Sequence, residues 1–389
     1  MKKPVKKLAR LAEQFQAWAL EESLPLWWKA NRLANGAFYE ALDFEGRPVP
    51  EPRARVRVQA RQVYALALGW KLGFRKKSLP AKLESSIERF FDTCLGPEGL
   101  PGRIVNVENG ELVDPRPELY NTGFALMALA QSRKVLGGRA VDGRIGRLFD
   151  RIDEHLAHNN GDGYREFLPP NTIRLQNPHM HFFESLLVLY KATKNPEVLD
   201  RAEVLLSFIH DTFFDQRAGV VQEKVNPNLE MAVREYEPGH SMEWVWLLGW
   251  RSRLFDVPLD PFAVRLYTHY VSAGRAEGEA PMCLTVDQQP VDPSRRLWSQ
   301  TEALKAHLAI AELGPPDLAP SAVQRAIECA KAIREDWLEP TVAGGWLDHF
   351  DADGNLIAKD MPASMCYHMY VLVAELKRSA KKLRKRQFD

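Results

Sequence analysis

Histidines and carboxylates stand at helical spacing in this sequence, and together they are the groups that proton transfer requires. His240 and Glu243 lie three residues apart in EYEPGHSMEWVWLLGW (235–250), a stretch whose apolar spacing predicts a helix. Because imidazoles titrate near neutral pH, His240 and His368 can serve as an acid and a base in one reaction. We expect Glu243 to orient the ring of His240, and Arg61 to face an oxygen on which negative charge develops.

Other polar and aromatic residues near the starts of the same predicted helices suit a sugar. Amides and carboxylates bind hydroxyl groups, and an indole packs against the apolar face of a pyranose ring. The substrate-binding candidates are Tyr120, Asn121, Asn177, His181, Glu184, Trp246, Trp298 and Glu302. Each residue alone is more simply explained as a helix cap or a core residue. Burying so many polar groups without partners costs about 1–3 kcal/mol each, which favours a functional site.

Proton abstraction next to a carbonyl is the chemistry that these residues favour, and two alternatives stay open. A glycosidase would use two carboxylates, and Glu184, Glu243 and Glu302 can supply such a pair. A barrel that binds a sugar without turning it over is the other alternative. Metal binding is disfavoured, because His179 and His181 are two residues apart and do not share a helix face. No nucleotide-binding or serine-hydrolase motif is present, so we expect no metal and no cofactor.

Six apolar helices must position these groups, and they recur at a nearly constant interval. They are predicted at 61–74, 121–137, 181–194, 240–255, 300–314 and 364–378. Their starts are 60, 60, 59, 60 and 64 residues apart. A fixed period of this kind indicates a repeat architecture.

The segments between these helices repeat as well. Turn-rich stretches with short β-like flanks precede the apolar helices, at 38–49, 103–113, 164–175, 220–233, 282–291 and 346–360. More charged amphipathic helices come before these hairpins, for example at 81–95, 143–156, 196–213 and 321–338. The sequence therefore predicts an all-α fold, an (α/α)6 barrel with short β-hairpin loops at one end, as a single domain over 1–389. An open helical solenoid is the alternative. The first helix (5–31) is expected to pack outside as the partner of 61–74.

Composition limits the possible partners and the compartment. The chain has 389 residues, of which 45% are hydrophobic and 26% charged, and its net charge is +1, which argues against a general nucleic-acid binder. The four cysteines are widely spaced, and no apolar run is long enough to span a membrane. We expect a cytoplasmic monomer or homodimer that binds a small-molecule sugar and neither nucleic acid nor membrane.

Five segments, in order along nearly the whole chain, resemble the N-acylglucosamine 2-epimerase superfamily, and most of all its mannose isomerase branch. They are VQARQVY (58–64), NPHMHFFE (177–184), PGHSMEWVWL (238–247), RLWSQTEAL (296–304) and PASMCYHMY (362–370). The resemblance implies an (α/α)6 barrel that interconverts sugars at C1 and C2. It implies His240 and His368 as the acid/base pair, and as sugar-binding or supporting groups Arg61, Asn177, His181, Glu184, Glu243, Trp298 and Glu302.

Three positions depart from the pattern of the superfamily. Ala363 stands where cellobiose epimerases have a tryptophan, Ser364 where some isomerases have a glutamine, and Asn121 where an aspartate is common. The first departure removes the aromatic platform for a disaccharide. Together with the match at 362–370 it predicts aldose–ketose isomerisation of a mannose-type monosaccharide, with sugar 2-epimerisation as the alternative.

Overall fold

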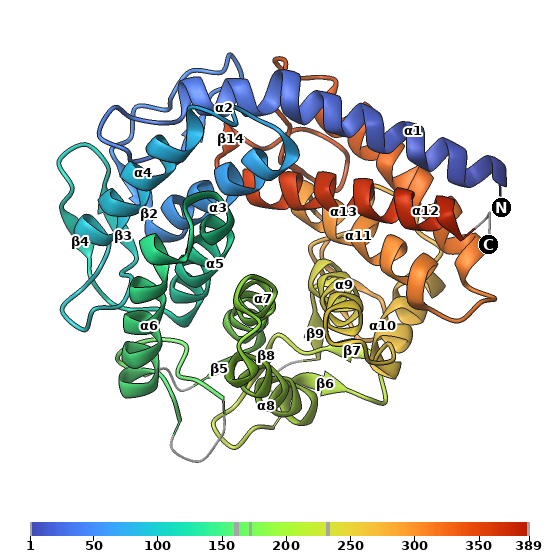
Figure 1. Cartoon of the computed structure of the whole chain (residues 1–389). Coiled ribbons are helices and arrows are strands. Elements are labelled where there is room, and N and C mark those ends of the chain that lie inside the picture. Colours follow the sequence, from blue (N-terminus) through green and yellow to red (C-terminus); the bar gives the residue numbers. More distant parts are fainter. Residues whose placement is uncertain (1, 159–162, 171–172, 231–233, 387–389) are drawn as a thin grey trace.

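The computed structural model describes residues 2–158, 163–170, 173–230 and 234–386, and in it six helices form an inner ring (Figure 1). Consecutive inner helices contact one another, and the last contacts the first, so the ring is closed. The (α/α)6 barrel predicted from the sequence is confirmed. The inner helices are α3 (Val56–Leu72), α5 (Leu119–Leu136), α7 (Gln176–Thr193), α9 (Pro238–Phe255), α11 (Leu297–Leu313) and α13 (Met365–Lys385).

Burial separates the inner helices from the outer ones. In α9 every residue from Pro238 to Trp250 is buried, because neighbours enclose it on all sides. In α6 only Val141, Ile145, Leu148 and Ile152 are buried, a single stripe at helical spacing. The outer helices are α4 (Leu79–Thr93), α6 (Gly138–His155), α8 (Pro196–Phe213), α10 (Pro261–Ser272) and α12 (Ala319–Ala332), which continues into the π-helical turn η2 (Ile333–Leu338).

The first helical segment differs from its prediction. It divides into α1 (Lys2–Trp18), the π-helical turn η1 (Ala19–Ser23) and α2 (Leu24–Ala30). The long helix α1 packs on α13 and α12, whereas we expected it beside α3. The start of α2 reaches α3, where a Cβ added to Gly69 would lie 2.8 Å from the Leu24 side chain. As a result α1 covers the place where the last repeat meets the first.

Short strands connect the loops at the end of the barrel where the inner helices begin. They are β1 (Ala41–Leu42), β2 (Arg53–Arg55), β3 (Ile104–Asn106), β4 (Leu112–Asp114), β5 (Arg174–Leu175), β6 (Phe214–Asp215), β7 (Val220–Val221), β8 (Lys224–Val225), β9 (Glu235–Tyr236), β10 (Cys283–Thr285), β11 (Pro290–Asp292), β12 (Arg295–Arg296), β13 (His349–Phe350) and β14 (Met361–Pro362). Hairpins form as predicted at β3–β4 and β10–β11.

Most of these pairings join one repeat to the next. The segment before each inner helix pairs with the following loop: β2 with β3, β5 with β8, β9 with β10 and β12 with β13. A bridge between Glu118 and Phe167 takes the same place before α5, and β14 pairs with β1. The stretch 164–175 was predicted as a hairpin, but its described flanks pair with other segments instead. Residues 171–172 and 231–233 of the predicted hairpins lie outside the described residues.

None of the helices in the described ranges is long and apolar enough to cross a membrane. All four cysteines are free, and three of them are buried.

Candidate active site

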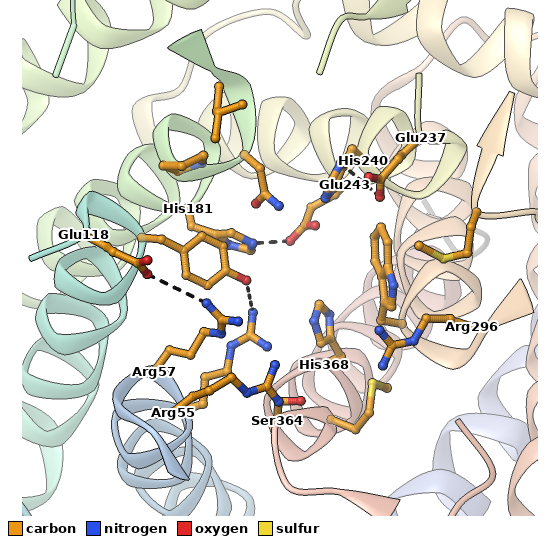
Figure 2. Close-up of a pocket in the computed structure, with 18 of the residues that line it drawn as sticks. Arg55, Arg57, Glu118, His181, Glu237, His240, Glu243, Arg296, Ser364 and His368 are labelled. Atoms are coloured by element: carbon orange, nitrogen blue, oxygen red, sulfur yellow. Dashed lines mark hydrogen bonds and ion pairs between the residues drawn. The ribbon is translucent and has the colours of Figure 1, made fainter. Parts of the chain in front are cut away.

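A cavity of about 400 Å³ opens among the loops, where the first turns of the inner helices converge (Figure 2). It is lined by eight of the twelve residues predicted for the site: Arg61, Tyr120, Asn177, His181, His240, Glu243, Trp298 and His368. Helices of both halves of the chain contribute, because every inner helix begins at this end of the barrel. The N-termini of these helices also place positive dipole ends around the cavity, which favours negative charge inside it.

His240 is held by two carboxylates at its outer side. Its Nδ1 lies 3.0 Å from Oε2 of Glu223 and 3.5 Å from Oε2 of Glu237. Burial opposes the charged form of the ring, but these carboxylates outweigh it and raise the pKa of His240 to about 10. His240 is therefore an imidazolium at neutral pH and can act as an acid.

His368, in contrast, favours the neutral form of its ring. Its Nδ1 forms a 2.8 Å hydrogen bond with Oε1 of Glu302, yet burial lowers the pKa of His368 to about 4. Oε2 of Glu302 in turn lies 2.6 Å from the ammonium of Lys305, and both side chains are fully buried. His368 is therefore neutral at pH 7, with Nδ1 occupied and the rest of the ring available as a base.

The rings of these two histidines flank Trp298. The Trp298 ring centroid lies 5.0 Å from that of His240 and 6.1 Å from that of His368. Gly239 makes this packing possible, because a Cβ at this position would lie 2.5 Å from Oγ of Ser299 and 2.6 Å from the Trp298 ring. The start of α9 thus approaches α11 closely, and the rings of His240, Trp298 and His368 line one side of the cavity.

A buried polar group faces these residues from α7. Nδ1 of His181 lies 3.2 Å from Oε2 of Glu184 and 4.0 Å from Oε1 of Glu243. Burial and nearby cations lower the pKa of His181 well below its usual value, so this ring is neutral. Burial and the charge of Glu302 raise the pKa of Glu243 well above its usual value, which favours the protonated carboxyl, a form that can donate a hydrogen bond to a ligand oxygen.

Arg61 lies between aromatic rings. Its Nη2 donates to the hydroxyl of Tyr120 at 2.6 Å, and its Cζ lies 4.1 Å from the centroid of Phe124 and 5.1 Å from that of Tyr367. Within the described ranges no carboxylate forms an ion pair with Arg61, which leaves its charge for a bound ligand.

Four predicted site residues lie elsewhere. Glu302 and Glu184 sit behind the cavity wall, where Glu302 binds His368 and Glu184 accepts a hydrogen bond from Tyr367. Asn121 donates to the backbone carbonyl of Gly102 at 2.7 Å. Trp246 lines a different cavity and packs under Lys305, whose Nζ is 3.5 Å from its ring centroid. Glu243 helps to raise the pKa of His240, but Glu223 and Glu237, and not Glu243, contact the Nδ1 of that ring.

Sequence reasoning missed several residues of the site. Glu237 is three residues before His240, and Arg57 is four before Arg61, so helical spacing was a usable signal for both. Glu223 carries no such signal, because it lies in the loop between β7 and β8. The other missed residues of the cavity wall are Arg55, Glu118, Phe167, Leu175, Pro178, Met282, Arg296, Ser364 and Met365.

Two clusters have ligand atoms close enough for a cation. They are His181 with Glu184 and Glu243, and His240 with Glu223 and Glu237. Glu184 is bonded to Tyr367 and Nδ1 of His240 to Glu223, whereas Oε1 of Glu243 is buried without a hydrogen-bond partner among the described residues.

The comparisons with known proteins agree with this fold. A family model described as N-acylglucosamine 2-epimerase matches residues 36–371. A mannose-6-phosphate isomerase of Rhizobium meliloti is 32% identical and aligns over 96% of this chain and 98% of its own length. A cellobiose 2-epimerase structure from Spirochaeta thermophila superposes with a TM-score of 0.84 at 20% identity, over 96% of this chain and 98% of that one. A D-mannose isomerase structure gives 0.78 at 17% identity, over 97% and 98%.

The closed (α/α)6 barrel and these relatives define an enzyme of the isomerase and epimerase class. The chain belongs to the N-acylglucosamine 2-epimerase family. The resemblance seen in the sequence is thereby confirmed.

Proposed function

We propose that the protein interconverts an aldose and a ketose of the mannose type, with His368 as the base and His240 as the acid. The observation that carries this proposal is the opposite charge state of two histidines on either side of Trp298 in one cavity. The 32% identity to a protein named mannose-6-phosphate isomerase supports aldose–ketose isomerisation over 2-epimerisation.

The reaction begins from the open-chain aldose. His368 removes the proton from C2, the C2–H electron pair forms a C1=C2 double bond, and the carbonyl oxygen O1 takes a proton from His240. The O2 hydroxyl then returns a proton to His240 as the C2=O2 double bond forms, and C1 receives the proton held by His368. Both histidines end in their starting state, so the cycle needs no other acid, base or redox group.

Arg61 and Glu243 support this cycle from the other walls of the cavity. Arg61 brings a guanidinium without a carboxylate partner in the described structure, and such a charge stabilises an enediolate oxygen. Glu243, whose raised pKa favours the protonated carboxyl, donates a hydrogen bond to a sugar oxygen. Trp298 provides a flat apolar surface beside the reacting carbons.

The glycosidase alternative fits this geometry poorly. It requires two free carboxyl groups on either side of a glycosidic bond. Of the three glutamates considered, Glu184 and Glu302 are bonded behind the wall to Tyr367 and His368, and only Glu243 lines the cavity. We also retain as proposals a cytoplasmic location and a monomeric or homodimeric state.

The test is incubation with D-mannose, and in parallel D-mannose 6-phosphate, in deuterated buffer followed by NMR. We expect the ketose to appear first, with deuterium at C1. His368→Asn and His240→Asn should each lower kcat by about 10²–10⁴-fold, whereas His155→Asn, on the outer helix α6, should not. A C2 epimer formed first, with deuterium at C2 and no ketose, would establish 2-epimerisation instead. Absence of exchange with either sugar would indicate a non-catalytic barrel.

A further inference from the structure

The two ends of the cavity differ in their balance of charge. At the α9 end, Glu223 and Glu237 surround His240, and Arg296 of the same wall is paired with Asp348. At the α3 end, Arg55 and Arg57 line the wall on the side away from His240 (Figure 2). A ligand with an uneven charge distribution therefore has one favourable orientation in this cavity.

The arginines at the α3 end outnumber the carboxylates that can neutralise them. Arg55 is bonded to Glu40 through its backbone and its guanidinium. Arg103 lies 2.6 Å from Glu118, which leaves the same carboxylate 3.9 Å from Arg57, beyond hydrogen-bond distance. Arg57 thus shares the carboxylate of Glu118 with Arg103, and Arg61 has no carboxylate partner among the described residues.

The surroundings of Arg57 make this excess charge unfavourable in the empty cavity. Burial and the like charges of Arg55 and Arg61 lower the pKa of Arg57 despite the nearby Tyr120. The Arg57 guanidinium lies 5.2 Å from the centroid of the Tyr120 ring, and its side chain remains 30% exposed. It is held against a rigid surface, and a ligand in the cavity can still reach it.

We propose that the sugar substrate carries a phosphate at the end remote from the reacting carbons, and that Arg57 binds it beside Arg55 at the N-terminus of α3. This inference rests on the proposed function, because the acid and the base fix which end of the sugar reacts. A phosphate monoester carries about −1.5 to −2 charges at pH 7, which offsets the excess of Arg55, Arg57 and Arg103 over the carboxylates of Glu40 and Glu118 at this end. The first turn of α3 adds a positive dipole end and backbone N–H groups, both of which favour a phosphate.

The experiment compares kcat/KM for D-mannose 6-phosphate, D-mannuronate and D-mannose in the wild type and three variants. Arg57→Gln removes the charge, Arg57→Lys keeps it, and Arg53→Gln is the matched control. Arg53 lies on β2, directly before α3, and pairs with Glu51 outside the cavity. Binding of fructose 6-phosphate and of fructose is measured in parallel by calorimetry, so that the result does not depend on turnover.

We expect the wild type to prefer the phosphorylated sugar, with mannuronate intermediate. Arg57→Gln should lower the preference for mannose 6-phosphate over mannose by about 10- to 100-fold, the usual worth of a charged hydrogen bond. Arg57→Lys should restore part of this preference, and Arg53→Gln should not change it. Equal kcat/KM for mannose and its phosphate in the wild type would overturn the inference while leaving the isomerase proposal intact. If no sugar is turned over, calorimetry decides: tighter binding of the phosphorylated ketose that is lost in Arg57→Gln supports the inference, and equal binding refutes it.

Discussion

The buried ion pair behind His368 provides the sharpest test of how this site is built. Lys305→Met removes an ammonium that lies 2.6 Å from Glu302 in a fully buried position, while keeping a side chain of similar length. Breaking a buried pair by removing one partner costs about 3–5 kcal/mol, because the other charge is left uncompensated. We therefore expect the free energy of unfolding to fall by about this amount, as measured by urea denaturation.

The double variant Glu302→Gln/Lys305→Met separates stability from catalysis. Removing both charges should recover most of the loss, giving a coupling energy of about 2–3 kcal/mol in a double-mutant cycle. The activity of the double variant should be lower than that of the wild type, because His368 then lacks the carboxylate that binds its Nδ1 at 2.8 Å. Additive stability losses in the double variant would refute this account of the pair, and so would full activity.

The single variant Lys305→Met should also change the pH dependence of kcat/KM. Lys305 is one of the cations that lower the pKa of His368, so its removal should raise that pKa from about 4. A neutral base is lost as pH falls through its pKa, so the acid limb of kcat/KM should move to higher pH. Lys305→Arg is the control variant, because it keeps the charge. An acid limb that does not move in Lys305→Met would contradict the coupling.

Other perturbations test the remaining parts of the site. The rate should fall as pH rises through about 10, where His240 loses its proton, and Glu223→Gln should move this basic limb to lower pH because Glu223 is the main carboxylate that raises the pKa of His240. Gly239→Ala should lower kcat/KM at least about tenfold by displacing Trp298, at a cost of about 1–3 kcal/mol in stability. Gly146→Ala is its control, because a Cβ there meets nothing within 4 Å. Dialysis against EDTA should leave activity unchanged; loss of activity that added metal restores would refute the metal-free cycle.

The fold could be predicted from the sequence because the same pattern of apolar residues recurs in every repeat. Every inner helix is enclosed by neighbours, so its apolar run is long, and the runs recur at one interval. The predicted starts at 61, 121, 181, 240, 300 and 364 lie within five residues of the observed ones. The first helix was placed wrongly because its own pattern shows only which face is apolar. The identity of the helices it packs on depends on where the ring closes, and that is a property of the whole chain.

Of the site, the sequence could predict only the residues in the first turns of the inner helices, which surround the cavity. First turns of the inner helices face the cavity, so His240, His368 and Arg61 were found. Trp246 is six residues after His240, which places it about 9 Å deeper along the helix and on another face. Tyr120 and Asn121 are adjacent, so a rotation of about 100° prevents both from facing the cavity.

The ring of strand pairs between successive loops has a consequence for how such an enzyme can be recombined. Each loop that lines the cavity shares backbone hydrogen bonds with the loop of the next repeat, and β14 with β1 links the last to the first. The helix–hairpin–helix repeat is therefore not an independent module. A loop transplanted from a relative arrives without the strand it pairs with, and two facing segments must be exchanged together. In a chimaera, crossover points suit the connections at the opposite end of the barrel, where the inner helices lead into the outer ones.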